Sequence, residues 1–271
     1  FDANKLLSAS FQIGSVLGAG IGGVVVHLYS PFVALWINVI AYLISGILIS
    51  LAPFNYKKKP TNNKNLLKSF LMGFTYLRER KDIATISMTT ILSDVAIWGA
   101  LSVLTISLSI EIFDKGAWGY GLLDGLYGIG AVFSVILVGI VSAKFNRKTI
   151  LQFSYLLGAV ALYMSSIMPN IYLASIFFFI LGVNINSGRI ITRTIVMENV
   201  ENNIMGRVQT LLGIYTRIMV VLSSLLTGYM IESLSLESAV YFACFHYIVA
   251  TTGVLFVSRI WTTSKKYLIT H

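Results

Sequence analysis

Residues 171–197 read IYLASIFFFILGVNINSGRIITRTIVM, an apolar run in which Arg189 and Arg193 are the only charged residues. A helix needs about 20 predominantly apolar residues to cross the hydrocarbon core of a bilayer, and this run is long enough to do so. Because lipid offers no hydrogen-bond partner to backbone amides, a segment that crosses it must satisfy them internally, as a helix does. The stretch therefore predicts an all-α membrane protein.

Seven further apolar runs of similar length lie on either side of this stretch, separated by polar breaks. The eight predicted spans cover residues 6–28, 32–53, 83–110, 118–141, 150–168, 171–197, 208–231 and 238–260. The composition agrees, because 56% of the 271 residues are hydrophobic and only 11% are charged, against about 25% charged residues in a soluble domain. A water-soluble core is excluded.

The basic residues indicate how the spans are oriented. The net charge of +9 is concentrated in short tracts between the spans, which is typical of residues that orient a membrane protein and argues against nucleic-acid binding. These tracts fall in alternate loops, at Lys57, Lys58, Lys59, Lys64, Lys68, Arg78, Arg80, Lys81, Lys144, Arg147, Lys148, Arg207, Lys265 and Lys266. The opposite loops are short, and Lys115 is their only lysine or arginine. The basic loops and both ends of this segment are therefore predicted to be cytoplasmic, in the inner (plasma) membrane.

The polar interruption at 54–81 predicts an amphipathic helix on the cytoplasmic surface. Apolar side chains recur there at helical spacing amid lysines and arginines, at Leu66, Leu67, Phe70, Leu71, Phe74 and Leu77. The linker leaves two helices before it and six after it.

The single cysteine and the start of the chain carry less information. Cys244 lies inside an apolar run, where we interpret it as a packing residue rather than as part of a disulfide framework. The chain opens at Phe1 with neither an initiator methionine nor a signal peptide, so we expect it to be part of a longer protein. No cofactor or metal is expected.

A glycine pattern stands in the first predicted span. Residues 14–23 read GSVLGAGIGG, in which Gly14, Gly18 and Gly22 form a helical ridge without side chains and Gly23 follows. Such a ridge lets another helix approach backbone to backbone.

Two further patterns follow the fourth and the sixth spans. Residues 139–148 read GIVSAKFNRK and hold Gly139, Lys144, Arg147 and Lys148. Residues 197–208 read MENVENNIMGRV, an acidic turn followed by Gly206 and Arg207.

These three patterns, in register with the predicted spans, resemble signatures of the major facilitator superfamily. The first is similar to the fifth-helix antiporter motif GxxxGPxxGG, with Ala19 in place of proline, and implies an exporter whose two halves meet at this helix. The second resembles the loop motif GxxxD[RK]xGR[RK], but Ala143 replaces the aspartate and Asn146 the glycine. This change removes the family's charge relay here and leaves two alternatives, a gating role or simple orientation by charge. The third resembles the turn between the tenth and eleventh helices of macrolide-efflux and siderophore (enterobactin) exporters.

The resemblance implies that the eight spans are helices 5–12 of a twelve-helix major facilitator fold. Residues 1–54 then supply the last two helices of the N-terminal bundle, 55–81 the basic linker and 82–271 the C-terminal six-helix bundle. The substrate cavity of that family needs both halves, so the first four helices would come from outside this chain. The implied gating and helix-packing residues are Gly14, Gly18, Gly22, Gly23, Gly139, Lys144, Arg147, Lys148, Gly206 and Arg207.

Polar side chains inside the predicted spans are candidates for the transport site. A charge at the bilayer centre costs about 2.5–3.5 kcal/mol, so each is a functional hypothesis until a partner explains it. The substrate and ion-coupling candidates are Asp94, Asp124, Asn186, Arg189 and Arg217. Asp94 is either a proton-titrating carboxylate that faces a central cavity or the partner of an arginine on a neighbouring helix.

The other candidates also have two interpretations. Arg189 shares a helical face with Asn186 and is expected to bind an anionic substrate or to pair with Asp94. Asp124 lies nearer the outer end, where we favour a structural role, and Arg193 is close enough to the cytoplasmic end to snorkel. Arg217 is deep enough to need an acceptor, either structural or in the substrate. The tryptophans and other aromatic residues line an amphiphile cavity or face lipid and the interface.

The motifs of other function classes are missing from the sequence. It contains no phosphate-binding GxxxxGK[ST] loop, no HExxH helix and no nucleophile elbow. We therefore expect the protein to be a secondary active transporter and not an enzyme. It is expected to export a small amphiphilic compound, such as a drug or a siderophore, in exchange for protons, and to do so by alternating access in the lipid bilayer. The alternatives are a polytopic membrane enzyme or lipid-handling protein, and a non-functional transporter fragment.

Overall fold

The computed structural model describes residues 14, 18, 21–26, 28–51 and 66–257, and all regular structure in these ranges is helical. This agrees with the predicted all-α class. The helices are α2 (Pro31–Leu51), α3 (Leu66–Glu79), α4 (Lys81–Val95), η1 (Ala96–Leu101), α5 (Ser102–Ser107), η2 (Leu108–Ile112), α6 (Gly116–Ser142), α7 (Arg147–Ile167), α8 (Ile171–Asn199), α9 (Asn202–Ser233) and α10 (Leu236–Phe256).

Seven helices in the described part of the chain are long and apolar enough to cross a bilayer. They coincide with the second to eighth predicted spans, and α4, η1, α5 and η2 together form one of them, from Lys81 to Ile112. The first predicted span, 6–28, lies mostly outside the described residues, so the count of eight stays a prediction. Helix α9 begins six residues before its predicted span, at Asn202 rather than at 208, because its polar first turns continue the helix beyond the apolar stretch.

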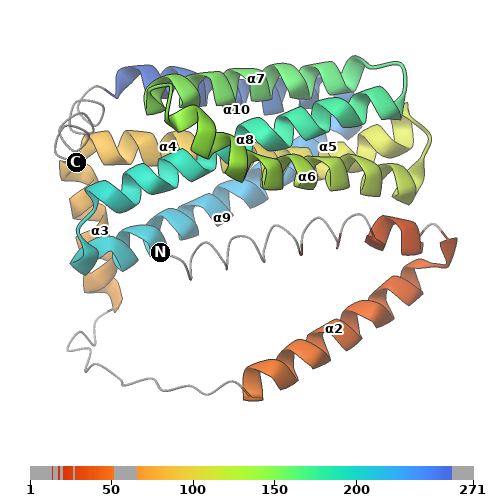
Figure 1. Ribbon diagram of the computed structural model, residues 1–271, viewed down its shortest axis with the longest axis horizontal. Coiled ribbons are helices and arrows are strands. Elements are labelled where there is room, and N and C mark those ends of the chain that lie inside the picture. The colour runs from red at the N-terminus through yellow and green to blue at the C-terminus, as the bar shows by residue number, and fades with distance from the viewer. Residues whose placement is uncertain (1–13, 15–17, 19–20, 27, 52–65, 258–271) are drawn as a thin grey trace.

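The helices from α4 to α10 lie side by side as a bundle, whereas α2 lies apart from them (Figure 1) and buries none of its residues. Helix α8 is the central element, with α6 on one side and α7 on the other. Helix α9 is the least buried span of the bundle, and its buried residues are only Val208, Ser223 and Thr227.

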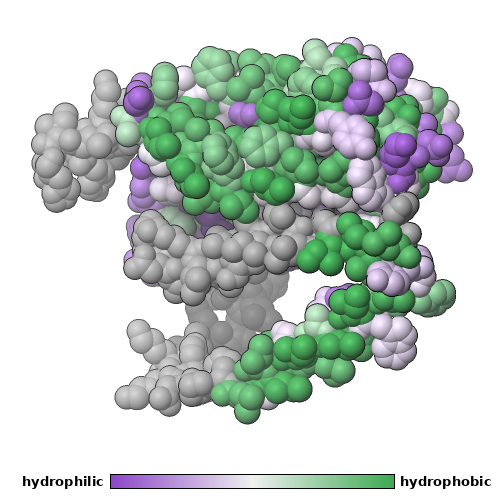
Figure 2. Space-filling view, turned by 45° about the vertical axis from the view of Figure 1, so that its right-hand side comes forward, coloured by the Kyte–Doolittle hydropathy of each residue, from purple (hydrophilic) through white to green (hydrophobic). Residues whose placement is uncertain are grey.

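The surface of the bundle is apolar. Figure 2 shows hydrophobic residues over most of the visible face and hydrophilic residues mainly toward its ends. Large side chains such as Ile136, Leu225 and Phe245 are exposed. A soluble monomer rarely exposes an apolar surface of this extent, and lipid would cover it. The chain is a multi-pass membrane protein.

Glycines bring α6 and α8 into backbone contact. A Cβ atom added to Gly130 would meet the carbonyl oxygen of Phe179, and one added to Gly182 would meet the carbonyl oxygen of Tyr127. Without side chains at these positions, the two backbones approach closely and gain dispersion contacts that do not depend on water.

A wider π-helical turn, η1, interrupts the long helix Lys81–Ile112 near its middle and packs on α9. A Cβ atom added to Gly99 would lie 2.7 Å from the Cβ of Ser223. The Gly99 carbonyl accepts hydrogen bonds from the hydroxyls of Ser102 (2.9 Å) and Ser224 (3.2 Å). Single π turns of this kind are found frequently at functional sites in helices.

A helix is present in the basic linker, where the sequence predicted one. Helix α3 runs across the ends of the bundle helices (Figure 1), and Arg80 is the one residue between α3 and α4. Residues 52–65 lie outside the described part, so the division into two helices of an N-terminal bundle (1–54), a linker (55–81) and a C-terminal six-helix bundle (82–271) stays a prediction.

The contact between α6 and α8 gives a test of the packing. Gly130→Ala is expected to lower the free energy of unfolding by about 1–3 kcal/mol, because the added methyl group cannot fit against Phe179. The measurement is thermal unfolding of the purified protein in detergent. The matched control is Gly139→Ala on the same helix, where an added Cβ meets nothing within 4 Å. An equal loss in both variants would contradict the packing.

Candidate functional site

Two charged residues from different helices meet inside the bundle. Asp94 lies near the end of α4, and Arg189 lies on α8; the Arg189 Nε and the Asp94 Oδ1 are 2.9 Å apart. Their side chains are 20% and 29% exposed. Asp94 is roughly 20 Å along its helix from Lys81, and Arg189 is roughly 15 Å from the end of α8 at Asn199. The pair therefore lies at middle depth in the bundle, where neither charge reaches bulk water easily.

The ion pair is close, although its angle is not that of a regular hydrogen bond. The Asp94 Oδ1 atom is buried, and its partner at 2.9 Å is the Arg189 Nε. The attraction between the two groups is therefore mainly that of opposite charges. A proton or a ligand that reached Asp94 would compete with Arg189 for this oxygen.

A network of neutral groups orients the arginine. The Arg189 Nη1 donates to the Asn186 Oδ1 (3.4 Å), and the Asn186 Nδ2 donates to the Gly182 carbonyl (3.1 Å) and to the Tyr127 Oη (3.4 Å). The sequence placed Asn186 and Arg189 on one helical face, and the structure brings them together. Tyr127 reaches this network from α6.

Trp98 covers the other side of the arginine. The Arg189 Cζ lies 5.8 Å from the centre of the Trp98 ring, which is close enough for a cation–π interaction. Trp98 stands in η1, four residues after Asp94, so one helical segment supplies both the acid and the aromatic ring.

The contacts of Tyr127 and Trp98 with the charged site were not predicted from the sequence. The four-residue spacing from Asp94 to Trp98 is a signal that was present. Nothing distinguishes Tyr127 from the many other tyrosines in the sequence.

The remaining candidates do not join this site. Asp124 is half-buried on α6, and no ion pair reaches it from the described residues. Arg193 and Arg217 are exposed. The acceptor that the sequence required for Arg217 is not among the described residues, and this side chain lies on the broad exposed face of α9.

The glycine ridge of the first predicted span has a more limited contact than expected. Added Cβ atoms at Gly14, Gly18 and Gly22 meet no described atom within 4 Å. A Cβ at Gly23 would instead lie 2.8 Å from the Cα of Gly121 on α6. Of this ridge, the part that touches the six-helix bundle is Gly23, and the gating role of the set stays a prediction.

A surface ion pair connects the second and third patterns. Arg147 at the start of α7 contacts Glu198 near the end of α8 through two hydrogen bonds, of 2.5 and 3.0 Å. In the second pattern, Ala143 stands where the family motif has an aspartate. In the structure, Glu198 of the third pattern provides a carboxylate for Arg147 instead. Lys144 is exposed and Lys148 half-buried. Added Cβ atoms at Gly139 and Gly206 meet nothing within 4 Å. Arg207 contacts α3.

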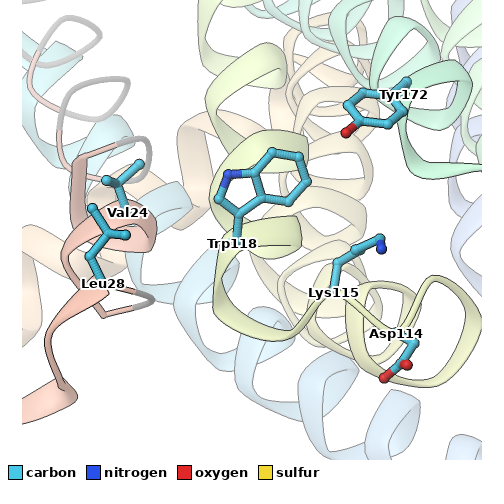
Figure 3. A pocket seen from close by; sticks show the side chains of 6 residues that line it. All are labelled: Val24, Leu28, Asp114, Lys115, Trp118 and Tyr172. Atoms are coloured by element: carbon cyan, nitrogen blue, oxygen red, sulfur yellow. The ribbon is translucent and has the colours of Figure 1, made fainter.

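A cavity of about 600 Å³ lies at the opposite end of α8 (Figure 3). Its lining residues are Val24, Leu28, Asp114, Lys115, Trp118 and Tyr172. Trp118 and Tyr172 pack edge to face with ring centres 6.1 Å apart. Tyr172 is roughly 25 Å along α8 from Arg189, and tryptophan, tyrosine and lysine at span ends are typical interface anchors. We therefore treat this cavity as part of the membrane interface and not of the charged site.

Comparison with known proteins gives one family and several relatives. The sequence matches the family described as "Transmembrane secretion effector" over residues 1–267. Proposed bacilysin exporters of Bacillus amyloliquefaciens and Bacillus subtilis are 26% and 25% identical over 207 residues, which are 76% of this chain and 51% of each relative. An uncharacterized MFS-type transporter of Bacillus subtilis (strain 168) is 26% identical over 190 residues, 66% of this chain and 45% of the relative. The chain spans about half the length of the curated relatives it matches.

The ion pair gives a stability prediction. Arg189→Gln is expected to lower the free energy of unfolding by about 2 kcal/mol, less than the 3–5 kcal/mol of a fully buried pair, because both side chains keep some exposure. The double variant Asp94→Asn/Arg189→Gln should lose less than the sum of the two single variants, since it leaves no unpaired charge. Thermal unfolding of all four proteins measures this coupling. The control is Arg147→Gln, whose exposed pair is worth about 0–1 kcal/mol; additive losses at Asp94 and Arg189 would refute the coupling.

Proposed function

The chain belongs to the transmembrane secretion effector family of MFS transporters, and on this premise we propose that it forms part of a secondary active transporter that exports small amphiphilic compounds in exchange for protons. Export is favoured because the relatives with an assigned activity are proposed exporters. The mechanism is alternating access around a site at middle depth. No catalytic step is assigned to the chain.

One observation carries the proposal: the carboxylate of Asp94 on α4 pairs with Arg189 on α8 at 2.9 Å, at middle depth in the bundle. Ionisable residues inside membrane spans mark ion and substrate pathways when they are paired with one another. Here the acid and the base come from two helices, so any change in the charge of Asp94 alters a contact between α4 and α8.

Exchange requires that the proton and the substrate exclude one another. A substrate with a cationic amine that pairs with ionised Asp94 meets this requirement, because protonation of the same carboxyl group removes its negative charge. Arg189 is the partner of the carboxylate while the site is empty. A substrate that bound Arg189 through an anionic group would instead bind best when Asp94 is protonated, and would then travel with the proton rather than against it.

The surroundings of the pair favour an amphiphilic substrate. Trp98 and Tyr127 offer aromatic surface beside the charged groups. Drugs and siderophore-like metabolites both combine apolar rings with polar donors, and we propose this broad class. Asp124 and the exposed Arg217 are secondary candidates that would act once further helices cover α9.

The complete transporter would contain helices that this chain does not supply. The chain spans about half of its relatives, and both α2 and one face of α9 are exposed. We propose that preceding helices complete the N-terminal bundle and cover these faces. The protein would lie in the inner (plasma) membrane with its basic loops in the cytoplasm.

The coupling role of Asp94 can be tested in proteoliposomes that contain the complete protein. Asp94→Asn is expected to reduce pH-driven export of a fluorescent amphiphilic amine at least tenfold, because an amide cannot carry the exchanged proton, whereas Asp94→Glu should retain part of the activity. Glu111→Gln, an exposed acid at the other end of the same long helix, is the control. Unchanged pH-driven export by Asp94→Asn would remove Asp94 from the coupling role.

The orientation can be tested in intact cells. A cysteine introduced as Lys59→Cys should react with a membrane-impermeant maleimide only after the cells are permeabilised, because the basic linker is expected in the cytoplasm. A cysteine introduced as Lys115→Cys should react without permeabilisation. Labelling in the reverse pattern would overturn the orientation and the transport direction with it.

A further inference from the structure

Helix α3 has a defined seat on the start of α9. Gly73 is buried in this contact, and a Cβ atom added to it would lie 3.1 Å from the Arg207 carbonyl oxygen and 3.6 Å from the Arg207 Cβ. Only glycine allows the two backbones to come this close without a shift of the neighbour. The contact is therefore specific to this register of α3.

Two side-chain contacts extend the seat to α8. The Tyr76 hydroxyl donates to the carbonyl of Asn199, the last residue of α8, at 3.3 Å. The Arg207 Nη1 donates to the Met72 Sδ at 3.5 Å. Tyr76 and Leu77 are half-buried against the core of the bundle. One short helix thus crosses the end of α8 and the beginning of α9, as Figure 1 also shows.

This seat gives the third sequence pattern a structural role. The pattern at 197–208 connects α8 to α9 and contains both the Asn199 carbonyl and the Arg207 backbone. Arg80, which joins α3 to α4, donates hydrogen bonds to Asp82 at the start of α4. The pattern therefore receives α3 through Asn199 and Arg207.

Helix α9 makes its close contacts with the bundle at two places. One is the seat of α3, beside the buried Val208; the other is the contact of Gly99 with Ser223, beside the buried Thr227. Between Val208 and Ser223 lie about 14 residues, roughly 22 Å of helix, with no fully buried side chain, although α9 also touches α4 and α10. The cytoplasmic half of α9 is thus held at its tip by α3, and the π turn η1 is the close contact about which it can turn.

The contacts that hold the tip are light. Among the described residues, no ion pair joins α3 to α8 or α9. Besides the packing of Tyr76 and Leu77, the seat consists of one close backbone approach, one hydroxyl bond and one weak bond to sulfur. Such a contact fits a part that opens and closes repeatedly rather than a permanent joint.

We propose that α3 is a releasable strap that holds the cytoplasmic half of α9 against the bundle, and that it leaves its seat during each transport cycle so that α9 swings about the contact of Gly99 with Ser223 and opens the cytoplasmic side. The release step rests on the proposed function. The seat itself does not, since it follows from the contacts of Gly73 and Tyr76.

A disulfide tests the strap directly in the complete protein. In the double variant Gly73→Cys/Arg207→Cys the Cβ atoms would be about 3.6 Å apart, within the range of about 3.5–4.5 Å that a disulfide spans. Oxidation is expected to link the two residues and to reduce pH-driven export at least tenfold, and a reductant should restore it. The native Cys244 is buried and does not compete.

The controls separate the seat from the release. The control is the double variant Gly73→Cys/Gly206→Cys, in which the second cysteine stands one residue before Arg207. An added Cβ at Gly206 meets nothing within 4 Å, so this disulfide should form far more slowly. A link no faster than in this control would overturn the seat. A complete link with export within twofold of the reduced protein would overturn the release. The single variants, assayed before and after oxidation, report any effect of crowding at Gly73.

A second measurement is independent of transport. Val208→Cys lies beneath the seat, where Val208 is fully buried, and its rate of reaction with a maleimide reports opening. Tyr76→Phe, which removes the bond to Asn199, is expected to raise this rate at least fivefold, whereas Tyr229→Phe on an exposed part of α9 should not change it. An unchanged labelling rate in Tyr76→Phe would overturn the strap, whether or not the wild-type protein exports the probe. A wild-type protein that exported nothing would count only against the proposed function.

Discussion

The hydrocarbon core of a bilayer offers no hydrogen-bond partner and no counter-ion, and the rest of this structure depends on that constraint. It makes every crossing segment helical, and it forces the two opposite charges at middle depth to find one another across α4 and α8. The same constraint gives the pair its chemical use. In the proposed mechanism, a carboxylate that is mostly shielded from water changes its charge when a proton or a ligand enters the site, so the charge of Asp94 would report occupancy.

Glycine has two opposite effects in the bundle. Between α6 and α8, the carbonyls of Phe179 and Tyr127 occupy the space that side chains of Gly130 and Gly182 would fill, at the centre of the most extensive helix contact among the described residues. At α9 the glycines that contact it, Gly73 and Gly99, are separated by a long stretch with no fully buried side chain. An extensive contact fixes a helix, whereas close approach at single points leaves it able to turn about them.

The sequence predicted the parts that depend on local pattern. Hydropathy alone placed the second to eighth spans, because a membrane helix needs only length and apolar content. Helical spacing placed Asn186 beside Arg189 on one face. The sequence left Asp94 with two interpretations because a pattern along the chain does not say which helices are neighbours in space. For the same reason it missed Tyr127, which reaches the site from a third helix, and the π turn that carries Trp98. The acceptor of Arg217 was expected from its depth, yet depth does not tell whether the partner belongs to this chain.

The order in which the two charges are synthesised follows from their places in the chain. Asp94 belongs to α4, and the spans α6 and α7 must be made before α8 brings Arg189. During membrane insertion, α4 therefore enters the translocation machinery without its counter-ion, and two complete helices pass before the neutralising residue arrives. The contact between α4 and α8 can form only at that point, so this part of the bundle is assembled after α7 has been made.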